Sequence, residues 1–107
     1  MESTILTRSV EYMDIRISRY SMKKGNCEII GLFLQAQDVH CYHYIPLHLG
    51  GNDKFNNLRI LHKDVHKLIH MTDTMKINTL IKNLVITQPM LQKVNNYREK
   101  CELERIE

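Results

Sequence analysis

All six histidines of this 107-residue chain lie between positions 40 and 70. They are His40, His43, His48, His62, His66 and His70. A single histidine on an apolar face is usually a hydrogen-bonded core residue or a surface residue, but this clustering weakens that interpretation for the group. An imidazole with its ordinary pKa of about 6.5 can accept a proton at neutral pH, and its neutral form can ligate a metal ion. The group therefore indicates proton transfer, metal binding or both.

His66 and His70 lie four residues apart in a segment whose apolar residues have helical spacing. Side chains at that spacing project from one face of a helix, where two imidazoles can share a metal ion. On the strand predicted before them, alternation places His40 and Tyr42 on one face and His43 on the other. A glycine-rich loop and a second short apolar run follow this strand. The pattern predicts a strand, loop, strand and helix unit that brings the strand histidines close to the helix pair.

The elements around this unit predict one small α+β domain that spans the whole chain, residues 1–107. Apolar residues recur at three- and four-residue spacing in the helical segments, and a glycine followed by asparagine is typical of the end of the first helix. The run CEIIGLFL is expected to form a turn and a short strand. The expected elements are an N-terminal helix at about 9–24, the strand and helix unit at about 36–72, and two C-terminal helices at about 74–86 and 88–102.

The composition excludes several classes of protein. Hydrophobic residues make up 43% and charged residues 25%, which fits a globular chain, and no apolar run approaches the ~18 residues of a membrane span. No signal peptide is recognisable, and three widely spaced cysteines favour a reducing compartment, so a cytoplasmic location is expected. The net charge of +3 comes from residues 52–84. A basic surface suits a polyanion, although a solvated helix face explains this surplus equally well.

The metal ligands that the sequence offers are few. The chain has no Cys-x-x-Cys pair and no His-Glu-x-x-His sequence. A structural zinc site requires four nitrogen or sulfur ligands in a closed arrangement. Two or three ligands with open positions are instead typical of a catalytic metal ion.

The segment HYIPLHLGGNDKFNNLRILHKDVHKLIH resembles the HNH endonucleases, with spacings of 14, nine and four residues between its key positions. The matching positions are His43, Pro46, Gly50-Gly51, Asn57-Leu58, His66 and His70. From about residue 9 onward the chain resembles the C-terminal HNH endonuclease domain of group II intron reverse transcriptase/maturase proteins. The resemblance implies a ββα-metal (His-Me finger) core flanked by one N-terminal and two C-terminal helices. It also implies metal-dependent hydrolysis of phosphodiester bonds in target DNA.

The resemblance implies a role for each matching residue. His43 matches the general base that deprotonates the attacking water, and Asn57 matches the asparagine that ties the loop to the strands. His66 and His70 match helix positions that supply metal ligands, and Tyr42 stands where the family has a ligand histidine. Four cations flank the site and are expected to hold phosphates without reading sequence. These are Lys54, Arg59, Lys63 and Lys67.

The cofactor implied by the resemblance is a divalent metal ion, with Mg²⁺ expected first and Mn²⁺ or Zn²⁺ as alternatives. The structural zinc that many relatives bind with two Cys-x-x-Cys pairs is not expected. The matching positions here are Cys27, Ile30, His62 and Val65, and apolar packing is expected to replace the zinc. The implied partner is DNA in a bacterial or organellar nucleoid, with group II intron RNA as a further partner through a parent protein. No membrane contact is expected.

Tyr42 leaves three alternatives open. Its neutral phenol, with an ordinary pKa of about 10, is a poor ligand that could bind metal only weakly. His40, two residues away on the same strand face, could substitute for it. Alternatively the site no longer cuts, and the chain is a nucleic-acid-binding module with an HNH-type fold. A small structural metal domain used for interaction is a third possible function.

Overall fold

The computed structural model describes the backbone of residues 2–107 and the side chains from residue 11 onward. Over this range the chain forms four α-helices, a two-stranded antiparallel sheet and two short 3-10 helices. The elements are α1 (Glu2–Met22), β1 (Val39–His43), η1 (Leu47–Leu49), η2 (Phe55–Asn57), β2 (Leu58–His62), α2 (Lys63–His70), α3 (Thr74–Leu84) and α4 (Gln88–Lys100). The predicted α+β class is confirmed. No helix in the described part of the chain has the length and apolar character needed to cross a bilayer.

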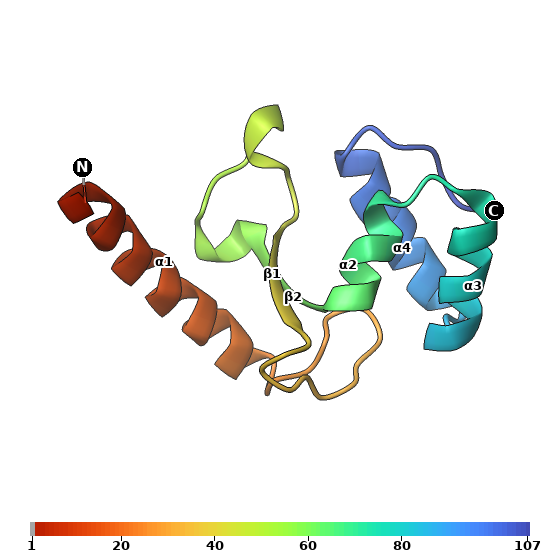
Figure 1. Ribbon diagram of the computed structural model, residues 1–107, viewed down its shortest axis with the longest axis horizontal. Coiled ribbons are helices and arrows are strands. Elements are labelled where there is room, and N and C mark those ends of the chain that lie inside the picture. The colour runs from red at the N-terminus through yellow and green to blue at the C-terminus, as the bar shows by residue number, and fades with distance from the viewer. Residues whose placement is uncertain (1) are drawn as a thin grey trace.

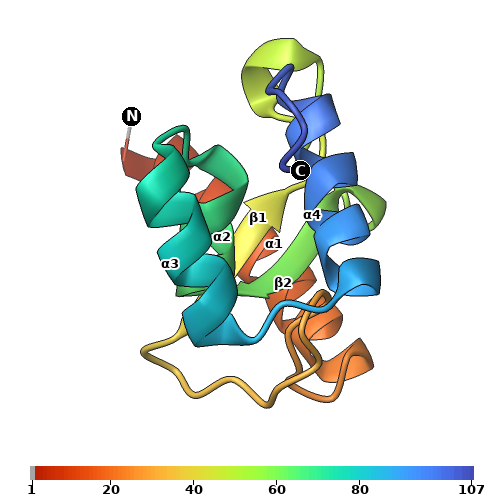
Figure 2. The same cartoon turned by 90° about the vertical axis from the view of Figure 1, so that its right-hand side faces the viewer.

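The sheet lies between α1 on one side and the three other helices on the opposite side (Figure 1). The register pairs Tyr42 with Arg59 and His43 with Leu58. Helix α2 follows β2 directly, so the predicted order of strand, loop, strand and helix is present (Figure 2). The predicted alternation is also present, because Tyr42 faces α2 whereas His43 stacks on Tyr12 of α1.

Helix α1 begins at Glu2, earlier than the predicted start near residue 9, and ends at Met22. Its end follows the expected mechanism, because the Gly25 amide donates to the Tyr20 carbonyl at 2.9 Å and Gly25 has a φ of 73°. A Cβ at Gly25 would lie 2.7 Å from the Phe33 ring, so only glycine fits this turn without displacement.

The short strand predicted in CEIIGLFL is wrong. This segment forms turns, with one isolated bridge between Asn26 and Phe33. Gly31 adopts a φ of 76°, and its amide donates to the Cys27 carbonyl. Cys27, Ile29, Ile30 and Leu34 are buried in the core without a ladder, whereas Leu32 and Phe33 are exposed. The left-handed glycine folds the run back on itself.

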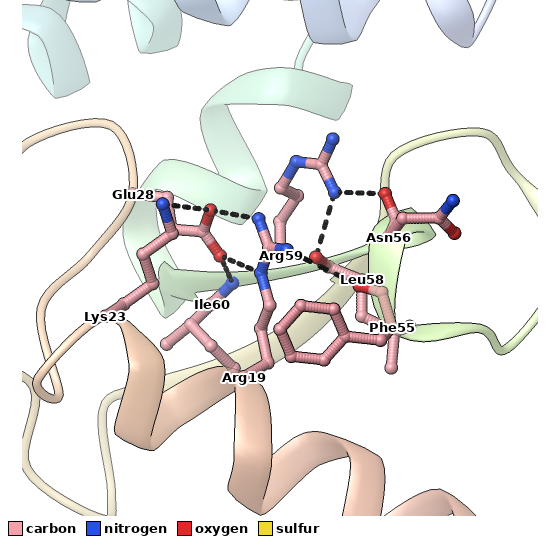
Figure 3. A network of polar contacts seen from close by, with 8 residues as sticks. All are labelled: Arg19, Lys23, Glu28, Phe55, Asn56, Leu58, Arg59 and Ile60. Atoms are coloured by element: carbon pink, nitrogen blue, oxygen red, sulfur yellow. Dashed lines mark hydrogen bonds and ion pairs between the residues drawn. The ribbon is translucent and has the colours of Figure 1, made fainter.

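A buried ion pair joins α1, this turn segment and β2 (Figure 3). The Glu28 carboxylate accepts two hydrogen bonds from the Arg19 guanidinium, at 2.6 and 2.9 Å, and a third from the Ile60 amide at 2.7 Å. The Glu28 amide donates to the Ile60 carbonyl at 2.9 Å, and the Arg19 guanidinium lies over the Phe55 ring. The Arg19 and Glu28 side chains are only 10% and 7% exposed. These contacts hold α1 against the sheet.

The two C-terminal helices lie where they were expected and end two residues earlier than predicted. Arg98 of α4 is buried, and its Nη1 donates to the carbonyls of Leu68, Ile69 and Met71 at the end of α2. A cation at this end of a helix satisfies carbonyls that have no intrahelical partner. Helix α4 therefore fixes the end of α2 from which His70 projects.

We expect Glu28→Gln to lower the free energy of unfolding by about 3 kcal/mol, because it leaves the buried Arg19 charge uncompensated. Lys23→Met is the matched control, since Lys23 reaches the same carboxylate at 3.7 Å from a side chain that is 39% exposed. It should cost less than about 1 kcal/mol. Urea denaturation of both variants measures the difference. Equal losses would contradict a central role for the Arg19 pair.

Candidate active site

The His43 imidazole is held from two sides at the end of β1. Its Nε2 lies 2.7 Å from the Asp53 carboxylate, and its ring stacks on that of Tyr12 with centroids 5.9 Å apart and planes 2° from parallel. A carboxylate only accepts hydrogen bonds when ionised, so Nε2 carries the proton and Nδ1 carries the lone pair. The predicted base is thus oriented by two residues that the sequence alone did not single out.

Asn57 ties the loop between the strands to the end of β1. Its Oδ1 accepts from the Ile45 amide at 2.8 Å, and its Nδ2 donates to the carbonyls of Ile45 at 3.1 Å and Asn52 at 2.8 Å. Its own carbonyl accepts from the Tyr44 amide. The loop is tight here, because a Cβ at Gly51 would lie 1.8 Å from the Ile45 carbonyl oxygen. The side chain therefore has the geometry expected for the loop-tying asparagine of the motif.

The histidines of α2 form a group with two residues of β1. The ring centroids of His66 and His70 lie 5.3 Å apart, and the Tyr42 ring packs against both, at 4.9 and 5.5 Å. His40 reaches the same group, with its Nδ1 2.9 Å from the Nδ1 of His66. Two ring nitrogens at this distance share one proton, so one donates and the other accepts.

Both α2 imidazoles favour the neutral form. Burial lowers the pKa of His66 to about 4, with further contributions from His70 and His40. Burial also lowers the pKa of His70, and the Arg98 charge adds to this effect. Each imidazole therefore keeps one ring nitrogen with a lone pair that could bind a metal ion at neutral pH.

The Tyr42 hydroxyl points to α4. Its oxygen lies 3.0 Å from the Cys101 sulfur, its ring packs on Tyr97, and the residue is 5% exposed. Burial, followed by the contact with Cys101, raises the pKa of Tyr42 well above its ordinary value. The phenolate needed for firm metal ligation is therefore disfavoured. Of the three alternatives for this position, weak ligation by Tyr42 has the least geometric support.

A pocket of about 240 Å³ lies at the end of β1. Its lining includes Tyr42, His43, His66 and His70, together with Pro46. Tyr42 and His43 project to opposite faces of the strand, yet both are among the residues that line this hollow. The candidate base and the α2 histidines thus share one space.

The donors fit a metal ion only in part. Among the side chains that the structure describes, residues 11–107, no group of three or more His, Cys, Asp or Glu is arranged to hold one. The available donors are His66 and His70, with His40 beside them, and all are imidazole nitrogens. Imidazole suits Zn²⁺ or Ni²⁺ better than Mg²⁺, which prefers oxygen ligands. The residues fit an open nitrogen-donor site that solvent or a phosphate would have to complete.

The four positions that the sequence resemblance matches to the zinc-binding positions of HNH endonucleases lie at the junction of the turn segment and α2. Ile30 and Val65 are buried in the core, and Cys27 is 2% exposed. The Cys27 sulfur accepts from the His62 amide at 3.4 Å, and the His62 Nδ1 accepts from the Asp64 amide at 3.0 Å. His62 thus caps the start of α2, and packing joins the two segments.

The four predicted phosphate-binding cations differ in their surroundings. Lys54 and Lys67 are exposed, whereas Lys63 pairs with Asp38 at 3.5 Å. Arg59 donates to the carbonyls of Asn56 and Leu58 and lies 4.8 Å from the Tyr44 ring centroid.

One further cation, which the sequence did not indicate, is Lys100 of α4. Its Nζ lies 5.8 Å from the Tyr44 ring centroid, so Lys100 and Arg59 contact the same ring. The sequence did not indicate Tyr12, Asp53 and Cys101 either, because only the folded chain brings them into contact with His43 or Tyr42. The position of Asp53 in the glycine-rich loop after the motif histidine was the only sequence signal.

Comparison of the chain with protein-family models, curated proteins and solved structures finds no match. The HNH resemblance therefore rests on the sequence motif and stays a prediction. The structure adds the placement of the motif's side chains around one pocket.

We expect the free energy of unfolding of the metal-free protein to fall as the pH drops from about 6.5 toward 4. The His66 pKa is lower in the folded chain than in the unfolded chain, so the unfolded state binds more protons in this window. After discounting for solvent screening, the loss due to His66 is about 1–2 kcal/mol. His66→Gln should flatten this part of the profile in urea denaturation with a chelator present, whereas exposed His48→Gln should not. Parallel profiles for His66→Gln and the parent chain would contradict the assignment.

Proposed function

We propose that the chain is an HNH-type endonuclease that hydrolyses phosphodiester bonds in DNA. The observation that carries this proposal is the single pocket onto which His43, His66 and His70 open. The strand, loop, strand and helix order and the Asn57 bonds that tie the loop support the same assignment. Group II intron target DNA is the substrate that the sequence resemblance favours, with the intron RNA reached through a parent protein.

His43 acts as the general base. Its Nδ1 accepts a proton from water, and the water oxygen attacks phosphorus as the bond to the 3′ oxygen breaks. The departing 3′ oxygen takes a proton from solvent and His43 returns its proton to solvent, which leaves a 3′ hydroxyl and a 5′ phosphate. A neutral imidazole is suited to this proton transfer near neutral pH. His66 and His70 would hold the divalent metal ion, with His40 as the substitute for the missing ligand. When bound, that ion supplies positive charge to the phosphate.

DNA binding in this proposal relies on cations of β2, of the loop before it, and of α2 and α4. Arg59 and Lys100 lie over the Tyr44 ring, and exposed Lys54 and Lys67 come from the loop and from α2. Contacts of this kind neutralise phosphates and carry no sequence information by themselves.

One observation favours a second candidate function, a DNA-binding module that no longer cuts. The Tyr42 hydroxyl is buried against Cys101, and among the described residues no three-ligand set is formed. This candidate predicts a shifted DNA band on a gel and intact supercoiled plasmid under every metal.

We expect the parent chain to nick supercoiled plasmid in the presence of Mn²⁺, Ni²⁺ or Zn²⁺, and His43→Ala to reduce the rate by 10²–10⁴-fold through loss of the base. His48→Ala is the matched control, since His48 is an exposed histidine of η1 outside this mechanism. Its nicking rate should equal that of the parent chain. Nicking that survives in His43→Ala would exclude His43 as the base, and DNA binding without nicking would select the second candidate.

We expect Tyr42→His to tighten metal binding by about tenfold or more, because it adds an imidazole beside His66 and His70. Tyr42→Phe is the control, since it also removes the hydroxyl contact with Cys101 but adds no ligand. Isothermal titration of the three proteins with Zn²⁺ and Mn²⁺ measures the difference. His40→Ala in the parent chain should weaken binding if His40 is the substitute ligand. Unchanged affinity in Tyr42→His would refute the placement of residue 42 beside the metal.

A further inference from the structure

The His43 imidazole is contacted by side chains from two segments outside its own strand. Asp53 comes from the loop that follows η1, and its carboxylate lies 2.7 Å from Nε2. Tyr12 comes from α1 and stacks parallel to the ring. The His43 and Asp53 side chains are 20% and 30% exposed, so the contact is partly shielded from water. An edge contact and a face contact together restrict both side-chain torsions of the imidazole.

The edge contact selects a tautomer. A neutral imidazole carries one proton, and an ionised carboxylate offers only acceptors. The Asp53 carboxylate therefore stabilises the tautomer with the proton on Nε2. The lone pair is then on Nδ1, the nitrogen on the opposite side of the ring from the carboxylate.

The face contact is itself fixed by neighbouring residues. The Tyr12 hydroxyl interacts with the Cys41 thiol, which shares a strand face with His43. Burial is the main reason that the pKa of Tyr12 rises to about 12, so the hydroxyl stays protonated. The Arg16 guanidinium lies 5.5 Å from the Tyr12 ring centroid. These contacts restrict the orientation of the Tyr12 ring, against which the His43 ring stacks.

We propose that Asp53 and Tyr12 are positioning residues that hold His43 as the Nε2-protonated tautomer, with its Nδ1 lone pair available to the pocket. Neither residue touches the substrate, and both act through His43. The catalytic importance of this device rests on the proposed function, but the tautomer and the ring stacking are properties of the free protein. They can be measured without any cleavage.

The test of Asp53 is nitrogen-15 NMR of the His43 ring in metal-free protein at a pH where the imidazole is neutral. The parent chain should show a protonated Nε2 and an unprotonated Nδ1. Asp53→Asn presents an amide that can donate to Nε2, so it should populate the Nδ1-protonated tautomer. Asp53→Glu should restore the parent pattern, and Asp14→Asn, an exposed change on α1, should not alter it. An unchanged His43 tautomer in a folded Asp53→Asn protein would overturn the proposal.

Kinetics separate this proposal from the proposed function. Where plasmid is nicked, Asp53→Asn should lower kcat by 10²-fold or more with KM unchanged, because the altered tautomer lacks the Nδ1 lone pair. A tautomer change in a chain that never nicks DNA would support the positioning device and refute the endonuclease. Nicking by an Asp53→Asn protein whose His43 tautomer and kcat are unchanged would support the endonuclease and refute the positioning role of Asp53.

Tyr12 is tested through the ring current of its aromatic face. The His43 ring protons should resonate upfield in the parent chain and in Tyr12→Phe, which keeps the stacked ring. Tyr12→Leu should lose this shift and lower kcat by about tenfold with KM unchanged. His43 ring-proton shifts that are the same in Tyr12→Leu and Tyr12→Phe would show that the Tyr12 ring does not position His43.

Discussion

The ion pair between Arg19 and Glu28 is the constraint on which the placement of α1 depends. It is buried, and the same carboxylate accepts the Ile60 amide of β2, so helix, turn segment and sheet meet at one charged group. Without this pair, two charges and a strand amide would lack their partners in a partly dry environment. The Arg19–Glu28 pair holds α1 beside the strands, and Tyr12 on that helix contacts His43 as a result.

Because side chains alternate along β1, the adjacent residues Tyr42 and His43 lie on opposite faces of the strand and pack against different helices. Tyr42 turns toward α2 and α4, where its hydroxyl contacts Cys101, whereas His43 turns toward α1 and stacks on Tyr12, and both residues line the pocket. The phenol gains packing against Tyr97 and two imidazoles, which stabilises the junction of α2 and α4. This packing occupies the position where the motif has a ligand. The proposed chemistry therefore combines a well-oriented base with an incomplete set of metal donors.

Residues that act through local pattern were predictable from the sequence, and residues that act through distant contacts were not. Strand alternation and the four-residue spacing on α2 placed Tyr42, His66 and His70 in one group correctly. The contacts of Cys101 with Tyr42 and of Tyr12 with His43 span much of the chain, and no short-range spacing encodes them. The turn expected in CEIIGLFL is present, but the short strand expected there is not, because a short apolar run fits a strand and a partly buried turn equally well.

The central claim is that one pocket brings a phosphodiester to His43 and to the α2 histidines at the same time. Nitrogen-15 shifts of the histidine rings, followed during titration with a duplex of uncleavable phosphorothioate DNA and Zn²⁺, test it most directly. The account predicts that His43, His66 and His70 shift together, while exposed His48 does not follow them. DNA-induced shifts confined to residues away from this pocket, with the three histidines unchanged, would contradict it.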